Sequence, residues 1–138
     1  MRTGVVVGTF DMFHIGHLNL LKNARVHCDC LIAGVNTDAV VLRDKHKIPI
    51  INERDRLEII RSIFCVSNAE LCTNNAVDFI RWLLQKNIKI DFYFRGDEPT
   101  KDYIVAENER IRALGVQVIQ FPYTKDISSS ELRTKLQK

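Results

Sequence analysis

Short apolar runs typical of buried strands alternate with helical patterns along the chain, and this alternation restricts the folds open to it. Strands are expected at Val5–Gly8, Leu31–Val35, Ala69–Cys72, Ile90–Phe94 and Val116–Phe121. Helices are expected at Leu18–Val26, Glu53–Phe64, Ala76–Lys86, Lys101–Leu114 and Ser128–Leu136. Because a helix separates each strand from the next, the pattern predicts an α/β fold, in which helices cover both faces of a parallel sheet.

Signals at the ends of these segments support the assignment. Asn52 is a plausible N-cap residue for the second expected helix, and Asp55 follows it in the pattern of a capping box. Gly115 comes directly after the fourth expected helix, where a left-handed residue commonly ends a helix. The stretch Arg43–Asn52, which contains Pro49, is the least regular, and we expect a substrate-covering loop there.

Size and composition predict one ordinary globular domain over residues 1–138, since 46% of the 138 residues are hydrophobic. The net charge is only +3 and the basic residues form no long run, which suits anionic substrates but gives little support to nucleic-acid binding. No apolar stretch is long enough to span a membrane, and the first residues enter a strand and do not resemble a signal peptide. We therefore expect a cytoplasmic protein without a membrane partner.

The four cysteines, Cys28, Cys30, Cys65 and Cys72, are expected to be free thiols. Their spacings fit no usual zinc pattern, so no metal site is predicted, although zinc binding with the help of His27 is an alternative.

The segment Gly8–His17 reads Gly-Thr-Phe-Asp-Met-Phe-His-Ile-Gly-His and joins the first expected strand to the first expected helix. The first N–H groups of a helix have no partner within it and the helix dipole is positive there, so this turn is a ready anion site. His14 and His17 stand at the turn, and Gly16 would let a phosphate or a base approach the backbone closely. The combination predicts a site for a nucleoside triphosphate.

On these residues the chain resembles the small cytidylyltransferases, which belong to the nucleotidylyltransferases with a His-x-Gly-His motif. Glycerol-3-phosphate cytidylyltransferase is their compact single-domain type. The resemblance rests on Gly8–Asp11 together with His14–His17, and it covers most of the chain. It implies a Rossmann-like fold with five parallel strands, Mg²⁺ as cofactor and a homodimer. The implied reaction transfers CMP from CTP to a small phosphorylated or phosphonate acceptor and releases pyrophosphate.

The resemblance also implies roles at the turn. His14 and His17 would contact the triphosphate as catalytic residues, and His17 would matter most in the transition state. The implied nucleotide-binding residues here are Gly8, Thr9, Phe10 and Gly16, with the backbone N–H groups of Thr9 and Phe10 facing the phosphates. Asp11 is expected to brace the loop and to take no part in acid–base chemistry.

Lys45 and Lys47 lie in the irregular stretch after the second expected strand. By resemblance a lysine here reaches the phosphates, and we favour Lys47 as the catalytic one, with Lys45 as a nucleotide-binding residue. Arg56 lies near the start of the next helix, where the family commonly has an arginine that contacts the nucleotide, and a planar guanidinium suits that contact. Ordinary solvent-exposed charges are the alternative for all three.

Arg95, Gly96 and Asp97 follow an expected strand, at a carboxyl end where ligands bind in such sheets. They resemble the family's glycine-aspartate turn, which implies that Gly96 and Asp97 bind the nucleotide near its base and ribose. Arg95 is a candidate for binding the acceptor phosphate. A plain turn is the alternative.

The stretch Tyr123–Ser130 is similar to the family motif Arg-Thr-x-Gly-Ile-Ser-Thr-Thr. The matching residues, implied to bind the nucleotide, are Ile127, Ser128 and Ser129. Tyr123 replaces the arginine of the motif and Asp126 replaces its glycine. Ser128 also begins a capping-box pattern, and both roles can hold because a hydroxyl-rich helix start is itself a phosphate site.

Two other functions stay open at this point. The chain could be an adenylyltransferase that uses ATP, as some relatives with the histidine motif are. It could also be a catalytically silent nucleotide-binding regulatory domain, which only the departures at Tyr123 and Asp126 support. The intact His14 and His17 argue against a silent domain, and the lack of a nucleophile–base pair agrees with direct attack by the acceptor.

Overall fold

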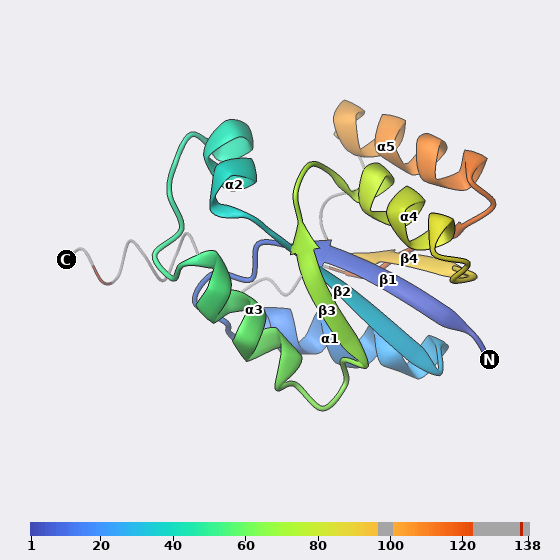
Figure 1. Ribbon diagram of the computed structural model, residues 1–138, viewed down its shortest axis with the longest axis horizontal. Coiled ribbons are helices and arrows are strands. Elements are labelled where there is room, and N and C mark those ends of the chain that lie inside the picture. The colour runs from blue at the N-terminus through green and yellow to red at the C-terminus, as the bar shows by residue number, and fades with distance from the viewer. Residues whose placement is uncertain (97–100, 123–135, 137–138) are drawn as a thin grey trace.

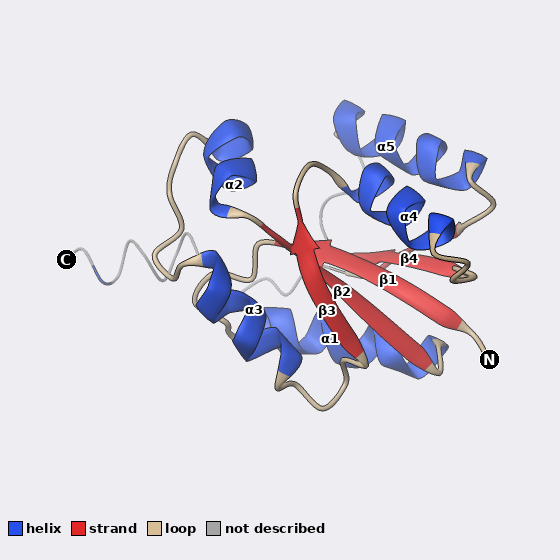
Figure 2. Ribbon diagram, in the orientation of Figure 1, coloured by secondary structure: helices blue, strands red, loops and turns tan. Residues whose placement is uncertain are grey.

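The computed structural model describes residues 1–96, 101–122 and 136. Its strands form one parallel five-stranded sheet in the order β3-β2-β1-β4-β5 (Figures 1 and 2). The strands are β1 (Thr3–Gly8), β2 (Cys30–Asn36), β3 (Asn68–Cys72), β4 (Phe92–Arg95) and β5 (Gln117–Gln120). The Rossmann-like α/β fold predicted from the sequence is therefore confirmed.

Helices cover both faces of this sheet, as expected (Figure 1). The described helices are α1 (Ile15–His27), α2 (Asp38–Lys45), α3 (Glu53–Arg61), α4 (Ala76–Gln85) and α5 (Asp102–Ala113). α1 and α3 pack on one face and α4 and α5 on the other, while α2 lies beyond the carboxyl end of β2. None of the described helices is both long enough and apolar enough to cross a membrane.

The core has two layers because successive residues of a strand point to opposite faces of the sheet. In β1, Val6 packs with α1 and α3, whereas its neighbour Val5 packs with α4 and α5. In β4, Phe94 and Tyr93 divide in the same way. Strands buried on both faces explain why the expected strands were continuous apolar runs without an alternation of polar residues.

The sheet reverses its direction of growth at β1, which pairs with β2 on one side and with β4 on the other. In open α/β sheets, ligands bind at the carboxyl ends of the strands beside such a reversal. The loops that follow β1 and β4 are therefore the part of the fold where a site is expected.

Within the described residues, the expected elements lie within three residues of the observed bounds, and one helix, α2, was missed. Residues Arg43–Lys45, expected in a loop, form the end of α2. Thr37 caps this helix, because its side chain accepts a hydrogen bond from Val40 N at 3.2 Å, and His46 ends it with a left-handed φ of 56°. The loop that we expected over Arg43–Asn52 is thus shorter and begins after the helix.

Two predicted helix ends are confirmed. Asn52 Oδ1 accepts a hydrogen bond from Asp55 N at 2.9 Å and caps α3. Gly115 has a left-handed φ of 84°, just after α5. The helix expected at Ser128–Leu136 lies outside the described residues, apart from Leu136.

Candidate active site

The two histidines of the motif cap the first helix. α1 begins at Ile15, so His14 is its N-cap residue. His14 Nδ1 accepts a hydrogen bond from Gly16 N at 3.0 Å, and His17 Nδ1 accepts one from His14 N at 3.2 Å. This is a capping box in which imidazoles take the places usually held by a hydroxyl and a carboxylate.

The capping box determines where each imidazole carries its proton. A ring nitrogen that accepts from a backbone N–H has no hydrogen of its own, so the neutral ring carries its proton on Nε2. The rings of His14 and His17 are stacked, with centroids 3.8 Å apart and planes inclined by 23°. The turn therefore presents two Nε2–H donors on stacked rings at the N-terminus of α1.

Aromatic neighbours keep the His17 ring partly buried. Phe10 contacts its ring edge-on at a centroid distance of 5.5 Å, and Phe13 lies at 5.5 Å on another side. Burial is the largest cause that lowers the pKa of His17, to about 4; nearby His14 and Lys45 lower it further, while Asp11 opposes them. Burial also lowers the pKa of His14. Both imidazoles are thus set up as neutral hydrogen-bond donors.

We expect His17 to keep its Nε2–H tautomer from about pH 7 down to about pH 5, because its folded-state pKa lies below the usual value of about 6.5. A group whose pKa is lowered by folding stabilises the fold above its unfolded pKa and loses that contribution as the pH falls. For His17 the loss spans about pH 6.5 to about pH 4. Nitrogen NMR of the imidazole ring and urea unfolding at both ends of this range check the prediction. Protonation of Nδ1 near neutral pH would contradict it.

The turn before α1 depends on tight packing around Phe10. Phe10 and Met12 have left-handed φ angles of 55° and 49°. Phe10 is buried over Gly8, where a Cβ atom would lie 3.0 Å from the phenyl ring. The resemblance implies that Gly8 binds the nucleotide; the structure shows that its lack of a side chain makes room for this ring.

Asp11 braces the turn, as the sequence predicted. Its buried carboxylate accepts hydrogen bonds from Ile50 N and Ile51 N, both at 2.9 Å. These bonds fix the β1–α1 turn against the loop between α2 and α3.

Arg56 is fully buried, and its guanidinium donates to four segments of the chain. Nε donates to Ile51 O at 2.8 Å, Nη1 donates to Thr9 O at 2.8 Å and Asn36 O at 2.7 Å, and Nη2 pairs with Asp38 Oδ1 at 2.5 Å. The expected contact with a nucleotide does not fit this position, because the N–H groups are directed at the protein. Arg56 instead holds the turn, the end of β2 and the start of α2 together.

The two candidate lysines lie at different places. Lys45 is the last residue of α2 and lines the pocket described below, and its charge contributes to the lowered pKa of His17. Lys47 is exposed in the following loop. The structure therefore brings Lys45 toward the histidines more clearly than Lys47, which we had favoured.

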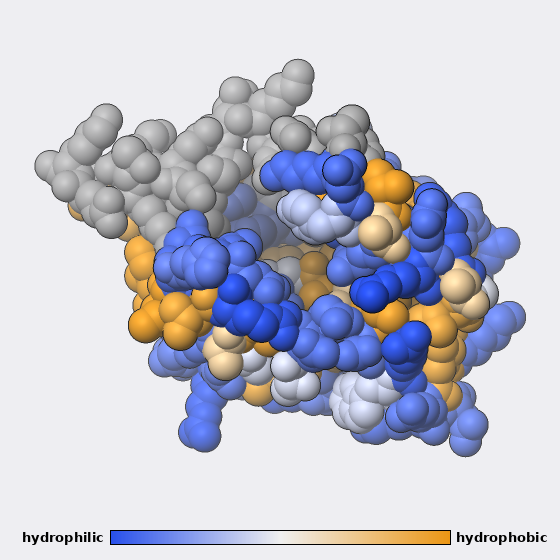
Figure 3. Space-filling model, turned by 90° about the horizontal axis from the view of Figure 1, so that it is seen from above, coloured by the Kyte–Doolittle hydropathy of each residue, from blue (hydrophilic) through white to orange (hydrophobic). Residues whose placement is uncertain are grey.

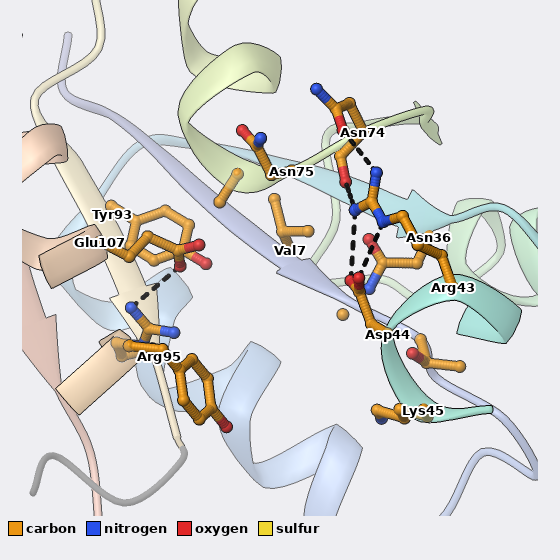
Figure 4. Close-up of a pocket in the computed structure, with 14 residues that line it drawn as sticks. Val7, Asn36, Arg43, Asp44, Lys45, Asn74, Asn75, Tyr93, Arg95 and Glu107 are labelled. Carbon is orange, nitrogen blue, oxygen red and sulfur yellow. Dashed lines mark hydrogen bonds and ion pairs between the residues drawn. The ribbon is translucent and has the colours of Figure 1, made fainter. Parts of the chain in front are cut away.

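A pocket of about 690 Å³ opens at the carboxyl ends of β1, β2 and β4, a size typical of small-molecule sites at about 300–1,000 Å³. Figure 3 shows the hollow, bordered mainly by hydrophilic side chains. Its principal lining residues are Val7–Thr9, Asn36, Arg43–Lys45, Asn74–Ala76, Tyr93, Arg95, Tyr103 and Glu107 (Figure 4). Arg95 is nearly buried there, and its Nη1 donates to Asn108 Oδ1 at 2.7 Å and pairs with Glu107 Oε1 at 3.1 Å.

Asn36, Asn74 and Asn75 were not identified from the sequence, although a signal was present. Asn36 is the last residue of β2, and Asn74 and Asn75 follow β3. The rule that ligands bind at the carboxyl ends of strands, which pointed to Arg95, applies to these strands too. Gly96 follows β4, where an added Cβ would meet only Leu20, at 3.4 Å. The other expected nucleotide ligands, Asp97, Ile127, Ser128 and Ser129, lie outside the described residues, as do Tyr123 and Asp126.

A helix N-terminus with paired histidines thus lies at the reversal point of a five-stranded Rossmann-like sheet, as the resemblance to the nucleotidylyltransferases implies. The chain belongs to the cytidylyltransferase-like family, whose model matches residues 5–135. The resemblance seen in the sequence is thereby confirmed.

Relatives and solved structures agree with this family. The chain is 31% identical over 133 residues to the bifunctional protein HldE of Nitrobacter winogradskyi, which covers 96% of this chain but 26% of the relative. It thus spans about a quarter of the length of the curated relatives it matches. A lipopolysaccharide core biosynthesis protein from Thermoplasma volcanium has a TM-score of 0.73 and 27% identity, covering 91% of this chain and 99% of that one. Thermotoga maritima TmcAL bound with alpha-thio ATP has a TM-score of 0.71 and 14% identity, covering 99% and 50%, which shows the fold alone.

Proposed function

We propose that the protein transfers CMP from CTP to a small phosphorylated acceptor. An oxygen of the acceptor phosphate attacks the α-phosphorus of the nucleotide, the bond from that phosphorus to the bridging oxygen breaks, and pyrophosphate leaves with the electron pair. The observation that carries this proposal is the pair of stacked Nε2–H donors at the start of α1.

The protein's part in this reaction is to position the phosphates and to stabilise charge. Negative charge grows on the bridging and leaving oxygens, and preformed donors at that place lower the barrier without reorganising. The Nε2–H groups of His14 and His17 supply such donors, and Lys45, with Lys47 on the adjoining loop, supplies positive charge. We also propose nucleotide contacts from Gly8, Thr9, Phe10 and Gly16 at the turn, and from Gly96, Asp97, Ile127, Ser128 and Ser129 elsewhere.

Mg²⁺ is proposed here as a companion of the triphosphate. Among the described residues, no group of three or more His, Cys, Asp or Glu side chains could hold a metal ion. Asp11, the carboxylate of the turn, is buried and accepts from two backbone N–H groups. We therefore propose that the ion keeps phosphate oxygens and water as its main ligands. When bound, Mg²⁺ would neutralise phosphate charge.

The family model and the sequence motif support cytidine as the base. ATP is the competing donor, because TmcAL, which has the same fold, was solved with alpha-thio ATP. The residues proposed to lie near the base and ribose are Gly96 and Asp97, and Asp97 lies outside the described residues.

Pyrophosphate release tests the proposal directly. The protein is incubated with Mg²⁺, either CTP or ATP, and a panel of phosphorylated acceptors. We expect pyrophosphate only when an acceptor is present, because no residue forms a covalent intermediate, and faster release with CTP than with ATP. Faster release with ATP would assign the adenylyl alternative. Tight nucleotide binding without pyrophosphate from any acceptor would instead support a silent binding domain.

A further inference from the structure

The pocket lies next to the histidine pair. Thr9 and Lys45 line the pocket, whereas His14 and His17 are not among its lining residues. In an in-line displacement, the attacking and leaving oxygens lie on opposite sides of the phosphorus. If the histidines stabilise the leaving side, as the proposed function on which this inference rests requires, the pocket lies where the acceptor enters.

Two ion pairs lie within the walls of this pocket. On one side, Arg43 Nε lies 2.8 Å from Asp44 Oδ1; on the other, Arg95 Nη1 lies 3.1 Å from Glu107 Oε1 (Figure 4). Each wall therefore combines a guanidinium with a carboxylate, and Lys45, which also lines the pocket, leaves the lining with a small positive charge overall. Such walls offer many hydrogen-bonding atoms but little net charge.

Neutral amide groups complete the lining. The side chains of Asn36 and Asn75 belong to the same space, and Arg43 is fixed across its rim by hydrogen bonds to Asn74 Oδ1 at 2.6 Å and Asn74 O at 2.7 Å. Amides, carboxylates and guanidinium groups together both donate and accept hydrogen bonds. A ligand rich in hydroxyl groups, each of which is donor and acceptor, matches this lining.

We propose that the pocket holds the body of a polyhydroxylated acceptor, a sugar or polyol phosphate, and that Glu107 selects it by accepting hydrogen bonds from its hydroxyl groups. Glu107 faces the pocket from α5 and is 25% exposed, while its partner Arg95 is only 8% exposed and is held by the buried Asn108 (Figure 4). Arg95 thus positions the carboxylate. A cationic headgroup such as choline suits the pocket less well, because both carboxylates that could attract it are already paired.

Glu107→Gln keeps the shape of the side chain and removes its charge and one strong acceptor. With CTP and Mg²⁺, we expect the KM for glucose 1-phosphate or glycerol 3-phosphate to rise about tenfold. The KM for the nucleotide should stay within about twofold of the wild-type value, since Glu107 lies in the acceptor pocket. Glu109→Gln, the same change at an exposed position of α5, is the matched control and should leave both constants unchanged.

Binding without turnover separates this inference from the proposed function. Amide NMR of the full chain is followed as glucose 1-phosphate, glycerol 3-phosphate or choline phosphate is added. Shifts at Asn36, Asn75 and Glu107 with the first two probes, weakened by Glu107→Gln, would support the pocket assignment even if no pyrophosphate formed. Preferred binding or turnover of choline phosphate would overturn it while leaving nucleotidyl transfer intact. Pocket residues that respond to none of the probes would overturn it as well.

Discussion

His17→Ala is expected to lower kcat by about 10²–10³, the usual loss when one donor to a developing oxyanion is removed. The missing group is the Nε2–H that the capping box directs away from the backbone. The KM for the nucleotide should change much less, because the interaction strengthens as charge develops on the leaving oxygens. Steady-state kinetics of pyrophosphate release with the best acceptor gives both constants.

The control for this variant lies on the same helix. His27→Ala removes an exposed imidazole at the other end of α1 and should leave kcat unchanged. Because His17→Ala also removes the acceptor of His14 N, its free energy of unfolding should fall by about 1 kcal/mol. Urea unfolding of both variants separates this structural effect from the catalytic one. A folded His17→Ala enzyme with wild-type kcat would remove His17 from the mechanism.

Arg56→Ala is expected to destabilise the fold by about 3–5 kcal/mol, because it removes a fully buried guanidinium that pairs with the half-buried Asp38 and donates to three carbonyl groups. The change leaves Asp38 without its guanidinium and strips a hydrogen bond from the carbonyl groups of Thr9, Asn36 and Ile51. The free energy of unfolding in urea measures the effect, with Arg54→Ala, an exposed position of α3, as the matched control.

If Arg56→Ala fails to fold, Arg56→Lys tests the same contacts with a smaller expected loss of stability. An ammonium group carries three donors at one point and cannot reproduce the fork of a guanidinium, so an intermediate loss of stability is expected. A loss below about 1 kcal/mol in either variant would show that Arg56 is not what joins the turn to β2 and α2.

The sheet and most helices could be predicted because their signals are local and repeated. α2 was missed for an equally local reason: it is short, its buried residues Val40 and Val41 are adjacent, and it ends in the charged run Arg43–Lys45. No helical period can be recognised in such a segment. The cap at Thr37, followed by the acidic Asp38, was the signal that pointed to a helix.

The same distinction between local signals and distant contacts applies to the site residues. His14 and His17 could be found because the motif and the strand-to-helix context lie in one short segment. The burial of Arg56 could not, because its partners Thr9, Asn36 and Asp38 are 47, 20 and 18 positions away in the sequence. Contacts of this kind exist only once the sheet has brought separate loops together. The same holds for the pairing of Arg95 with Glu107, which joins β4 to α5.

The central claim is that a nucleotide's polyphosphate binds at the two Nε2–H groups that open α1. A crystal structure with Mg²⁺ and a CTP analogue carrying a methylene group between its α- and β-phosphates tests it most directly. We predict phosphate oxygens within about 2.7–3.2 Å of Nε2 of both His14 and His17. A polyphosphate bound beside Arg43 and Asn74, with neither imidazole in contact, would contradict the account.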